Sequence, residues 1–330
     1  MNAGRRWSKW SVDDFKAQRS PLFDRCVVAL GTFDGVHVGH RRILEAACSL
    51  ARETGGDAVA FTFDRHPQET LAPERAPALL SGFERRLELI QSAGVHHTVV
   101  AEFDHRFAAV EAGDFLDAVV LGALGARAVV VGYNFRFGRG ASGDAAFLSR
   151  AARERGFRLE VAPPVEIGGE PVSSTRIRRE LAGGDVAAAA LLLGRPFSLS
   201  GRVKAGDARG RALGFPTANL EPEPRVAVPG DGVYITRVHI DGEETGAVRS
   251  ALTVIGRRPS FGQLERAIES FLLDYSGDLY GARIEIEFLS RLRDVVKFDS
   301  AEALKRQIED DVAKAREYFA RTAARSAACD

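Results

Sequence analysis

Apolar segments of two kinds alternate along the first half of this chain of 330 residues. Short runs with strand character cover residues 26–30, 58–63, 97–103, 127–132 and 158–161. Between them, apolar residues recur with helical spacing at residues 40–52, 82–93, 112–124 and 144–155. Such alternation predicts an α/β fold with a doubly wound parallel sheet that helices cover on both faces. Ligands bind such sheets at the carboxyl ends of the strands, so we expect the functional residues in the loops that follow the strands.

The pattern changes after a helical segment at residues 174–193. Short β segments then follow one another at residues 198–203, 232–240, 247–255, 267–274 and 283–289. They predict a small antiparallel β-barrel or sandwich. A final helix can be capped by Asp299 or Ser300 and should pack on the barrel. Its apolar stripe consists of Leu304, Ile308, Val312, Ala315 and Phe319.

These patterns divide the chain into an N-terminal extension at residues 1–22, an α/β domain at residues 23–193 and a barrel domain at residues 194–330. We expect residues 1–20 to be loosely packed, because they are polar and carry charges of both signs. They also lack the apolar stretch of a signal peptide. The most apolar run, at residues 186–193, is too short to span a bilayer.

The net charge and the cysteine content limit which classes of partner and which cellular compartment the sequence predicts. The chain has 45 basic and 45 acidic residues, so its net charge gives no electrostatic footprint for nucleic acid or an anionic membrane. Its three cysteines show neither a metal-binding spacing nor a disulfide pattern. We therefore expect a cytoplasmic protein with no nucleic-acid or membrane partner, and the sequence makes no prediction of oligomeric state.

A glycine-rich segment, Gly-Thr-Phe-Asp-Gly-Val-His-Val-Gly-His, occupies residues 31–40 directly after the first predicted strand. Glycines let backbone N–H groups approach a phosphate, and the following helix directs its free N–H groups to the same place. His37 and His40 lie three residues apart, so both can donate hydrogen bonds to a phosphate in the transition state. The alternative is a tight turn with two surface histidines. The other expected ATP or phosphate contacts here are Gly31, Phe33, Asp34 and Gly39.

Three further segments also follow strands or open a helix. His66 comes after the second predicted strand and is equally compatible with a structural role. Asn134 and Phe135 follow the fourth strand and offer an amide and an aromatic face to a ligand. Hydroxyls and arginines at the start of a helix form an anion site, although a serine there can also act as a helix cap. This last group contains Ser173, Ser174, Thr175, Arg176 and Arg178.

In order and position, these segments resemble the nucleotidyltransferase domain of prokaryotic bifunctional riboflavin kinase/FAD synthetases, over roughly residues 23–193. The resemblance implies that His37 and His40 bind the ATP phosphates, and that Arg176 and Arg178 steady the leaving pyrophosphate. It also implies that Asn134 lies near the incoming phosphate or flavin, and that the FMN phosphate attacks the α-phosphorus of ATP. Mg²⁺ would share the phosphates with these side chains. Arg65 departs from the family, which usually has proline there.

The second half contains another glycine-rich region, followed by Gly-Phe-Pro-Thr-Ala-Asn at residues 214–219. Thr217 and Asn219 lie two residues apart, so in an extended segment both point to one side and can bind Mg²⁺. Glu269 lies in an alternating strand and is either a solvent-facing residue or a general base for a hydroxyl. The Phe-Pro-Thr run could also be a plain turn. The expected phosphate contacts in this region are Gly201, Lys204, Gly206, Arg211 and Gly214.

Residues 196–321 resemble the riboflavin kinase domain of the same family, which implies that Thr217 and Asn219 hold Mg-ATP and that Glu269 takes the proton from the riboflavin 5′-hydroxyl. The implied substrates are therefore riboflavin, FMN and ATP. Val254 departs from the family, which commonly has asparagine there, so a hydrogen bond near the ligand is expected to be missing. Three alternatives follow: a monofunctional FAD synthetase with a weakened kinase module, a flavin-binding regulator, and a cytidylyltransferase for another phosphate compound.

Overall fold

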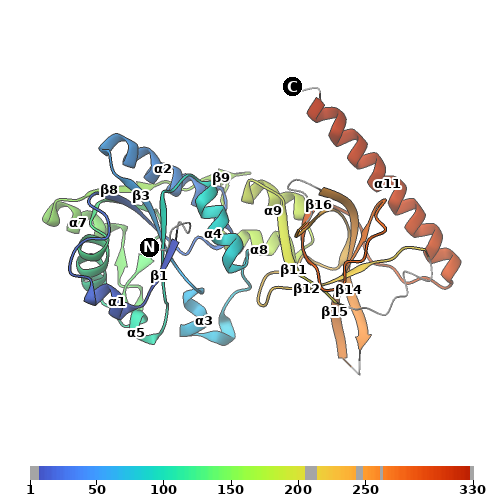
Figure 1. Ribbon diagram of the computed structural model, residues 1–330, viewed down its shortest axis with the longest axis horizontal. Coiled ribbons are helices and arrows are strands. Elements are labelled where there is room, and N and C mark those ends of the chain that lie inside the picture. The colour runs from blue at the N-terminus through green and yellow to red at the C-terminus, as the bar shows by residue number, and fades with distance from the viewer. Residues whose placement is uncertain (1–6, 205–213, 243–247, 261–262, 328–330) are drawn as a thin grey trace. The chain divides into compact units, whose positions relative to one another are not determined.

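The computed structural model describes residues 7–204, 214–242, 248–260 and 263–327 (Figure 1). The chain forms two compact units, Met1–Ser174 and Thr175–Asp330. The sequence places the boundary at residues 193–194, and that position stays a prediction. Among the described residues, none of the helices combines the length and apolar character needed to cross a membrane.

The first unit is built on a six-stranded sheet with the strand order β1-β4-β3-β2-β5-β8. Every neighbouring pair of strands is parallel. The strands are β1 (Trp7–Trp10), β2 (Cys26–Leu30), β3 (Asp57–Phe63), β4 (His97–Ala101), β5 (Ala126–Gly132) and β8 (Arg158–Ala162). The strand order reverses direction at β2 and β5, and the loops after these strands lie at that switch point.

Alternate residues of the central strands belong to two separate hydrophobic clusters. Val28 and Val59 pack in one cluster with the segment around Phe115 and Leu116. Val27 and Ala58 pack in the other, with helix α2 (Val38–Thr54). Because neighbouring residues of a strand point to opposite faces, the sheet is covered on both sides. The predicted doubly wound α/β fold is confirmed.

Residues 7–17 are packed on the sheet, contrary to the sequence prediction of a loose segment. Strand β1 pairs with β4 in parallel and adds an edge strand to the sheet. Helix α1 (Val12–Ala17) follows, with Ser11 and Asp14 forming a capping box. Val12 and Phe15 are 5% and 2% exposed and belong to the core of the sheet. The strand has only four residues with a polar pair between two tryptophans, so its sequence carries no strong strand signal.

Two predicted helices are divided or irregular. Residues 112–124 form α6 (Ala112–Asp114) and then η3 (Phe115–Ala123), a π-helix. Residues 174–193 form α8 (Ser174–Ala182) and α9 (Val186–Leu193). The break follows from Gly184, whose φ of 78° lies in the left-handed region that ends helices. The other main helices of the first unit are α4 (Phe83–Ser92), α7 (Ala145–Arg155) and the short α3 (Pro67–Leu71).

The second unit contains a closed antiparallel barrel with the strand order β11-β12-β15-β14-β13-β16. Its strands are β11 (Phe197–Lys204), β12 (Ala218–Pro222), β13 (Gly232–Ile240), β14 (Val248–Ser260), β15 (Gln263–Leu272) and β16 (Arg283–Arg293). The predicted barrel is confirmed. Strand β12 is not among the predicted β segments; the sequence prediction for this region is limited to an extended segment that carries Thr217 and Asn219.

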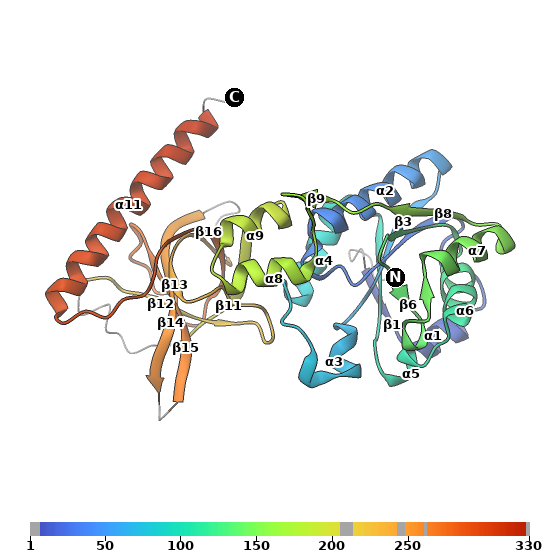
Figure 2. The ribbon, with the colours of Figure 1, turned by 180° about the vertical axis from the view of Figure 1, so that it is seen from behind.

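The C-terminal helix α11 (Ala301–Ala327) runs beside the barrel in both views (Figures 1 and 2). Val312, Ala315 and Phe319 pack on a cluster that includes Val233 and Leu252 of the barrel, as the sequence predicts. Ser300 Oγ accepts a hydrogen bond of 3.1 Å from the Ala303 N–H at the start of the helix.

The packing of α1 leads to a stability prediction. Phe15→Ala should destabilise the first unit by about 3–5 kcal/mol, because it removes a buried ring from the core. Guanidinium unfolding followed by tryptophan fluorescence measures this directly, since the only tryptophans, Trp7 and Trp10, are on β1. Lys16→Ala, at an exposed position of the same helix, is the control. Equal unfolding midpoints for the two variants would contradict the packed N-terminus.

Candidate active sites

The segment between β2 and α2 contains a strained turn. Phe33 and Val36 have φ values of 49° and 39°, and Gly35 between them has a φ of 75°. Positive φ costs a non-glycine residue of order 1–3 kcal/mol and persists only where the surroundings enforce it. At Gly35 a Cβ would also lie 2.7 Å from the Leu80 side chain. The turn therefore requires a glycine at this position and strong contacts elsewhere.

Asp34 provides those contacts. Its carboxylate accepts a hydrogen bond of 2.8 Å from the Leu80 N–H, and its backbone carbonyl accepts one of 3.2 Å from the Ser174 hydroxyl. Asp34 is 2% exposed, and Phe33 is fully buried. These side chains therefore shape the turn. The phosphate contacts expected of Gly31, Phe33, Asp34 and Gly39 stay a prediction.

The two histidines are stacked on each other at the start of α2. Their ring centroids are 3.7 Å apart and their planes differ by 16°. His37 is the N-cap of α2, and its Nδ1 accepts a hydrogen bond of 3.2 Å from the His40 N–H. Since Nδ1 is the acceptor, neutral His37 carries its proton on Nε2. A Cβ at Gly39 would lie 3.1 Å from the His37 ring, so glycine leaves room for this arrangement.

His40 is held in its neutral form. Burial of the ring, together with the neighbouring His37, lowers the pKa of His40 well below its ordinary value of 6.5. Within the described part of the chain, His40 Nδ1 is buried and has no hydrogen-bond partner. Two stacked imidazoles just after the carboxyl end of β2 can direct N–H donors at a polyphosphate. The sequence spacing predicts that they share a location but does not predict the stacking.

The loop after β3 carries His66. His66 is the N-cap of α3: its Nδ1 accepts from the Gln68 N–H at 3.2 Å, while its own N–H donates to Glu69 Oε1 at 2.9 Å. The structural role considered for His66 is therefore present, and its phosphate contact stays a prediction. Arg65, where the family usually has proline, donates to the Asp64 carboxylate, to which Lys9 of β1 also makes an ion pair of 3.0 Å.

The loop after β5 carries the expected flavin contacts. Asn134 is exposed, while Phe135 is partly buried and stacks on Phe137 with ring centroids 5.4 Å apart. Phe137 belongs to the core of the sheet. The alternation of these two phenylalanines therefore places the Phe137 ring in the core and leaves Phe135 partly accessible.

The hydroxyl- and arginine-rich segment spans the division between the units. Ser173 and Ser174 belong to the first unit, and Thr175, Arg176 and Arg178 to the second. Ser174 begins helix α8 and contacts the strained turn through Asp34. Arg176 and Arg178 are partly buried on that helix. Their contact with a pyrophosphate stays a prediction.

A second set of polar groups lies on the outer face of the barrel. Thr217 Oγ1 donates to Glu269 Oε2 at 3.4 Å, and Asn219 on β12 is the direct cross-strand partner of Glu269 on β15. The flanking residues Ala218 and Ser270 are 7% and 0% exposed, so they point into the barrel. Thr217, Asn219 and Glu269 are therefore brought together by the strand register. A hydroxyl, an amide oxygen and a carboxylate are the hard oxygen donors that Mg²⁺ prefers.

Two neighbours define the surroundings of this second set. Val254 on β14 is the cross-strand partner of Glu269 on the other side, so the residue that departs from the family lies directly beside the proposed base. Phe215 makes an edge contact with Phe271, with ring centroids 5.3 Å apart, and so ties the Gly-Phe-Pro-Thr segment to strand β15.

The remaining glycine-rich region is partly outside the described residues, where Gly206 and Arg211 lie. At Gly201 a Cβ would clash with the Glu221 carbonyl, so glycine is needed for the close approach of β11 and β12. Lys204 forms an ion pair with Glu221. Gly214 is exposed with a φ of 88°. The phosphate contacts expected of Gly201, Lys204, Gly206, Arg211 and Gly214 stay a prediction.

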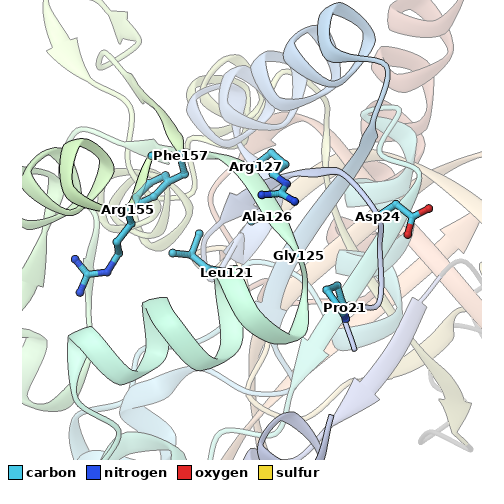
Figure 3. Close-up of a pocket in the computed structure, with 9 residues that line it drawn as sticks. Pro21, Asp24, Leu121, Gly125, Ala126, Arg127, Arg155 and Phe157 are labelled. Atoms are coloured by element: carbon cyan, nitrogen blue, oxygen red, sulfur yellow. The ribbon is translucent and has the colours of Figure 1, made fainter. Parts of the chain in front are cut away.

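Figure 3 shows a small cavity of about 150 Å³, which is lined by Pro21, Asp24, Leu121, Gly125, Ala126, Arg127, Arg155, Gly156 and Phe157. It lies beside the first residue of β5, at the end of the sheet opposite the strained turn. Cofactor sites usually occupy about 300–1,000 Å³. The cavity is thus too small for a flavin or a nucleotide.

The environment of His40 predicts how stability depends on pH. The unfolded chain binds a proton at His40 below about pH 6.5, whereas the folded chain does so only at a lower pH. Stability from this group is therefore complete above pH 6.5 and is lost as the pH falls below that value. The fluorescence unfolding midpoint should fall more steeply between pH 7 and pH 5 for the wild type than for His40→Gln. Identical pH dependence would contradict a buried neutral His40.

Comparison with known families assigns both halves of the chain. The FAD synthetase family matches residues 20–176, and the riboflavin kinase family matches residues 193–319. The first match contains the strained turn and the stacked histidines. The second contains Thr217, Asn219 and Glu269.

Individual relatives match both halves together. The bifunctional riboflavin kinase/FMN adenylyltransferase of Escherichia coli (strain K12) is 37% identical over 297 residues, covering 90% of this chain and 94% of the relative. The enzymes of the same name from Pseudomonas fluorescens and Bacillus subtilis (strain 168) are 40% and 33% identical and cover 91% and 89% of this chain, or 95% and 93% of their own lengths.

A solved structure shares the fold. A crystal structure from Streptococcus pneumoniae, described as a macrolide-efflux protein, has a TM-score of 0.83 and 31% sequence identity, covering 93% of this chain and 98% of that one. With both domains matched in sequence and nearly the whole chain matched in sequence and structure, the chain belongs to the bifunctional riboflavin kinase/FMN adenylyltransferase family.

Proposed function

We propose that this chain converts riboflavin and ATP to FMN and ADP at the barrel, and then FMN and ATP to FAD and pyrophosphate at the parallel sheet. The observation that carries the proposal is that each unit has its own set of reactive groups: the stacked histidines at the switch point of the sheet, and the Thr217–Glu269 contact on the barrel. The choice of riboflavin, FMN and ATP as substrates rests on the family to which the chain belongs.

In the kinase step, Glu269 is the general base. It accepts the proton of the riboflavin 5′-hydroxyl as that oxygen bonds to the γ-phosphorus of ATP and the bond to the ADP oxygen breaks. Thr217 donates a long hydrogen bond to Glu269 and so contributes to the orientation of the carboxylate. Thr217 and Asn219 would hold Mg²⁺, which supplies charge neutralisation on the phosphates when bound.

Val254 bears on the alternative of a weakened kinase. A valine beside Glu269 offers no hydrogen bond to its carboxylate, but the Thr217 hydroxyl donates one at 3.4 Å, and Asn219 is the cross-strand neighbour of Glu269. We therefore propose a functional kinase rather than a monofunctional FAD synthetase, a regulator or a cytidylyltransferase.

In the adenylyl transfer step, a phosphate oxygen of FMN attacks the α-phosphorus of ATP, and the bond from that phosphorus to pyrophosphate breaks. The N–H donors of His37 and His40 stabilise the charge that develops on the phosphate oxygens. A neutral His40 ring can donate a hydrogen bond to a phosphate oxygen without transferring its proton to that oxygen. Arg176 and Arg178 would balance the charge of the leaving pyrophosphate, while Asn134 and Phe135 would contact the flavin end of FMN.

These substrates require no nucleic acid or membrane, and a cytoplasmic location stays a prediction.

His40→Ala should reduce FAD formation from FMN by about 100-fold, because it removes a donor to the transition state. FMN formation from riboflavin should stay close to wild type, since the kinase groups lie in the other unit. Chromatographic separation of flavins after incubation with Mg²⁺ and ATP measures both reactions. His105→Ala, at an exposed position, is the matched control. Equal loss of both reactions would show that the sites are not separate.

Glu269→Gln should have the opposite effect. It should reduce FMN formation by about 100-fold, because the amide cannot accept the proton, and leave FAD formation from added FMN intact. The same chromatographic assay applies, with Glu302→Gln at an exposed position of α11 as the control. Undiminished FMN formation would rule out the general-base role.

A further inference from the structure

Arg86 is a buried cation that neither reaction described above uses. It lies on helix α4 and is 3% exposed. Its Nη2 donates hydrogen bonds to two backbone carbonyls, that of Phe63 at 2.6 Å and that of Asp64 at 3.3 Å. The guanidinium carbon lies 5.6 Å from the centre of the Phe83 ring. Arg86 therefore binds the backbone at the carboxyl end of strand β3.

The charge of Arg86 has no directly bonded counter-ion. Among the residues that the structure describes, Arg86 forms no ion pair, and its Nε has no hydrogen-bond partner. Burial lowers the pKa of Arg86, and the surrounding carboxylates of Asp34 and Asp64 oppose that change. A guanidinium keeps its proton in proteins. Burying such a charge costs several kcal/mol, which a purely structural hydrogen bond to two carbonyls does not require.

The position of Arg86 connects it to the adenylyl-transfer site. Strand β3, whose end it holds, is the hydrogen-bonded neighbour of β2. Thr62 Oγ1 donates to the Thr32 carbonyl at 3.0 Å, and the Gly31 N–H donates to the Phe61 carbonyl at 3.2 Å. Arg86 contacts the end of β3 at Phe63 and Asp64. The two preceding residues of β3 are hydrogen-bonded to the residues that begin the strained turn before His37.

We propose that Arg86 is a positioning residue for adenylyl transfer, which holds the end of β3 against the strained turn and contributes a buried positive charge to the electrostatics of the site. The inference rests on the proposed adenylyl-transfer function. Arg86 acts through the Phe63 and Asp64 carbonyls and through its charge, without touching the substrates. A buried charge is screened little by salt, so its effect on a tetra-anion persists in physiological buffer.

Arg86→Gln and Arg86→Lys separate the charge from the hydrogen bonds. Glutamine retains a donor but has no charge, whereas lysine retains the charge. Steady-state FAD formation from FMN, with ATP varied, should show a KM for ATP about tenfold higher for Arg86→Gln. Arg86→Lys should stay within about threefold of wild type. Arg106→Gln, which removes an exposed arginine that pairs with Asp13, is the matched control and should leave the KM unchanged.

Two results would overturn the proposal: a KM for ATP in Arg86→Gln equal to that of wild type, or an equal increase in Arg86→Lys and Arg86→Gln. Tryptophan fluorescence unfolding checks that each variant is folded. Should Arg86→Gln not fold, Arg86→Lys alone decides, and a tenfold rise in its KM contradicts a role for charge. A wild-type protein that makes no FAD from FMN would instead overturn the proposed function itself, and the inference with it.

Discussion

The buried carboxylate of Asp34 is the interaction on which the first site depends. It holds a turn in which Phe33 and Val36 both have positive φ. A hydrogen bond to a charged acceptor is worth about 1.5–3 kcal/mol, which is comparable with the strain at one such residue. By bonding Leu80 through its side chain and Ser174 through its carbonyl, Asp34 joins three segments that are far apart in the sequence. His37 follows the last residue with positive φ, Val36. The contacts of Asp34 that hold the turn therefore also determine where the histidine pair begins.

Strand register plays the corresponding role in the barrel. Glu269 faces outward between Asn219 and Val254, while the next residue, Ser270, faces inward. A slip of one residue would exchange the two and bury the carboxylate. The interior opposes such a slip, because the Thr253 hydroxyl is hydrogen-bonded to Thr236 at 2.8 Å and to Ser270 at 2.7 Å. Buried hydroxyls that lost these partners would each carry a desolvation penalty. Polar contacts inside the barrel therefore fix the reactive groups outside it.

Much of this arrangement could be predicted from the sequence, and the failures have physical reasons. Strand and helix periodicity is sufficient to predict the sheet and the barrel. Only the resemblance to the family predicts that Thr217 and Glu269 act at one site, because they lie 52 residues apart in the sequence. Strand β1 is too short and too polar to show a pattern, and its pairing depends on the edge of a sheet that the sequence does not reveal. The stacking of His37 on His40 depends on ring orientation. Arg86 has the spacing of an ordinary surface arginine, and only tertiary packing shows it to be buried.

The central claim is that one chain carries out two different transfers from ATP in two separate units. Tracing labelled phosphorus tests it most directly, since each transfer moves a different phosphorus atom. With ATP labelled at the γ-phosphorus, riboflavin should give labelled FMN. With ATP labelled at the α-phosphorus, added FMN should give labelled FAD and unlabelled pyrophosphate. Label in FAD but never in FMN would contradict the kinase half of the account, and label in neither flavin would contradict the whole of it.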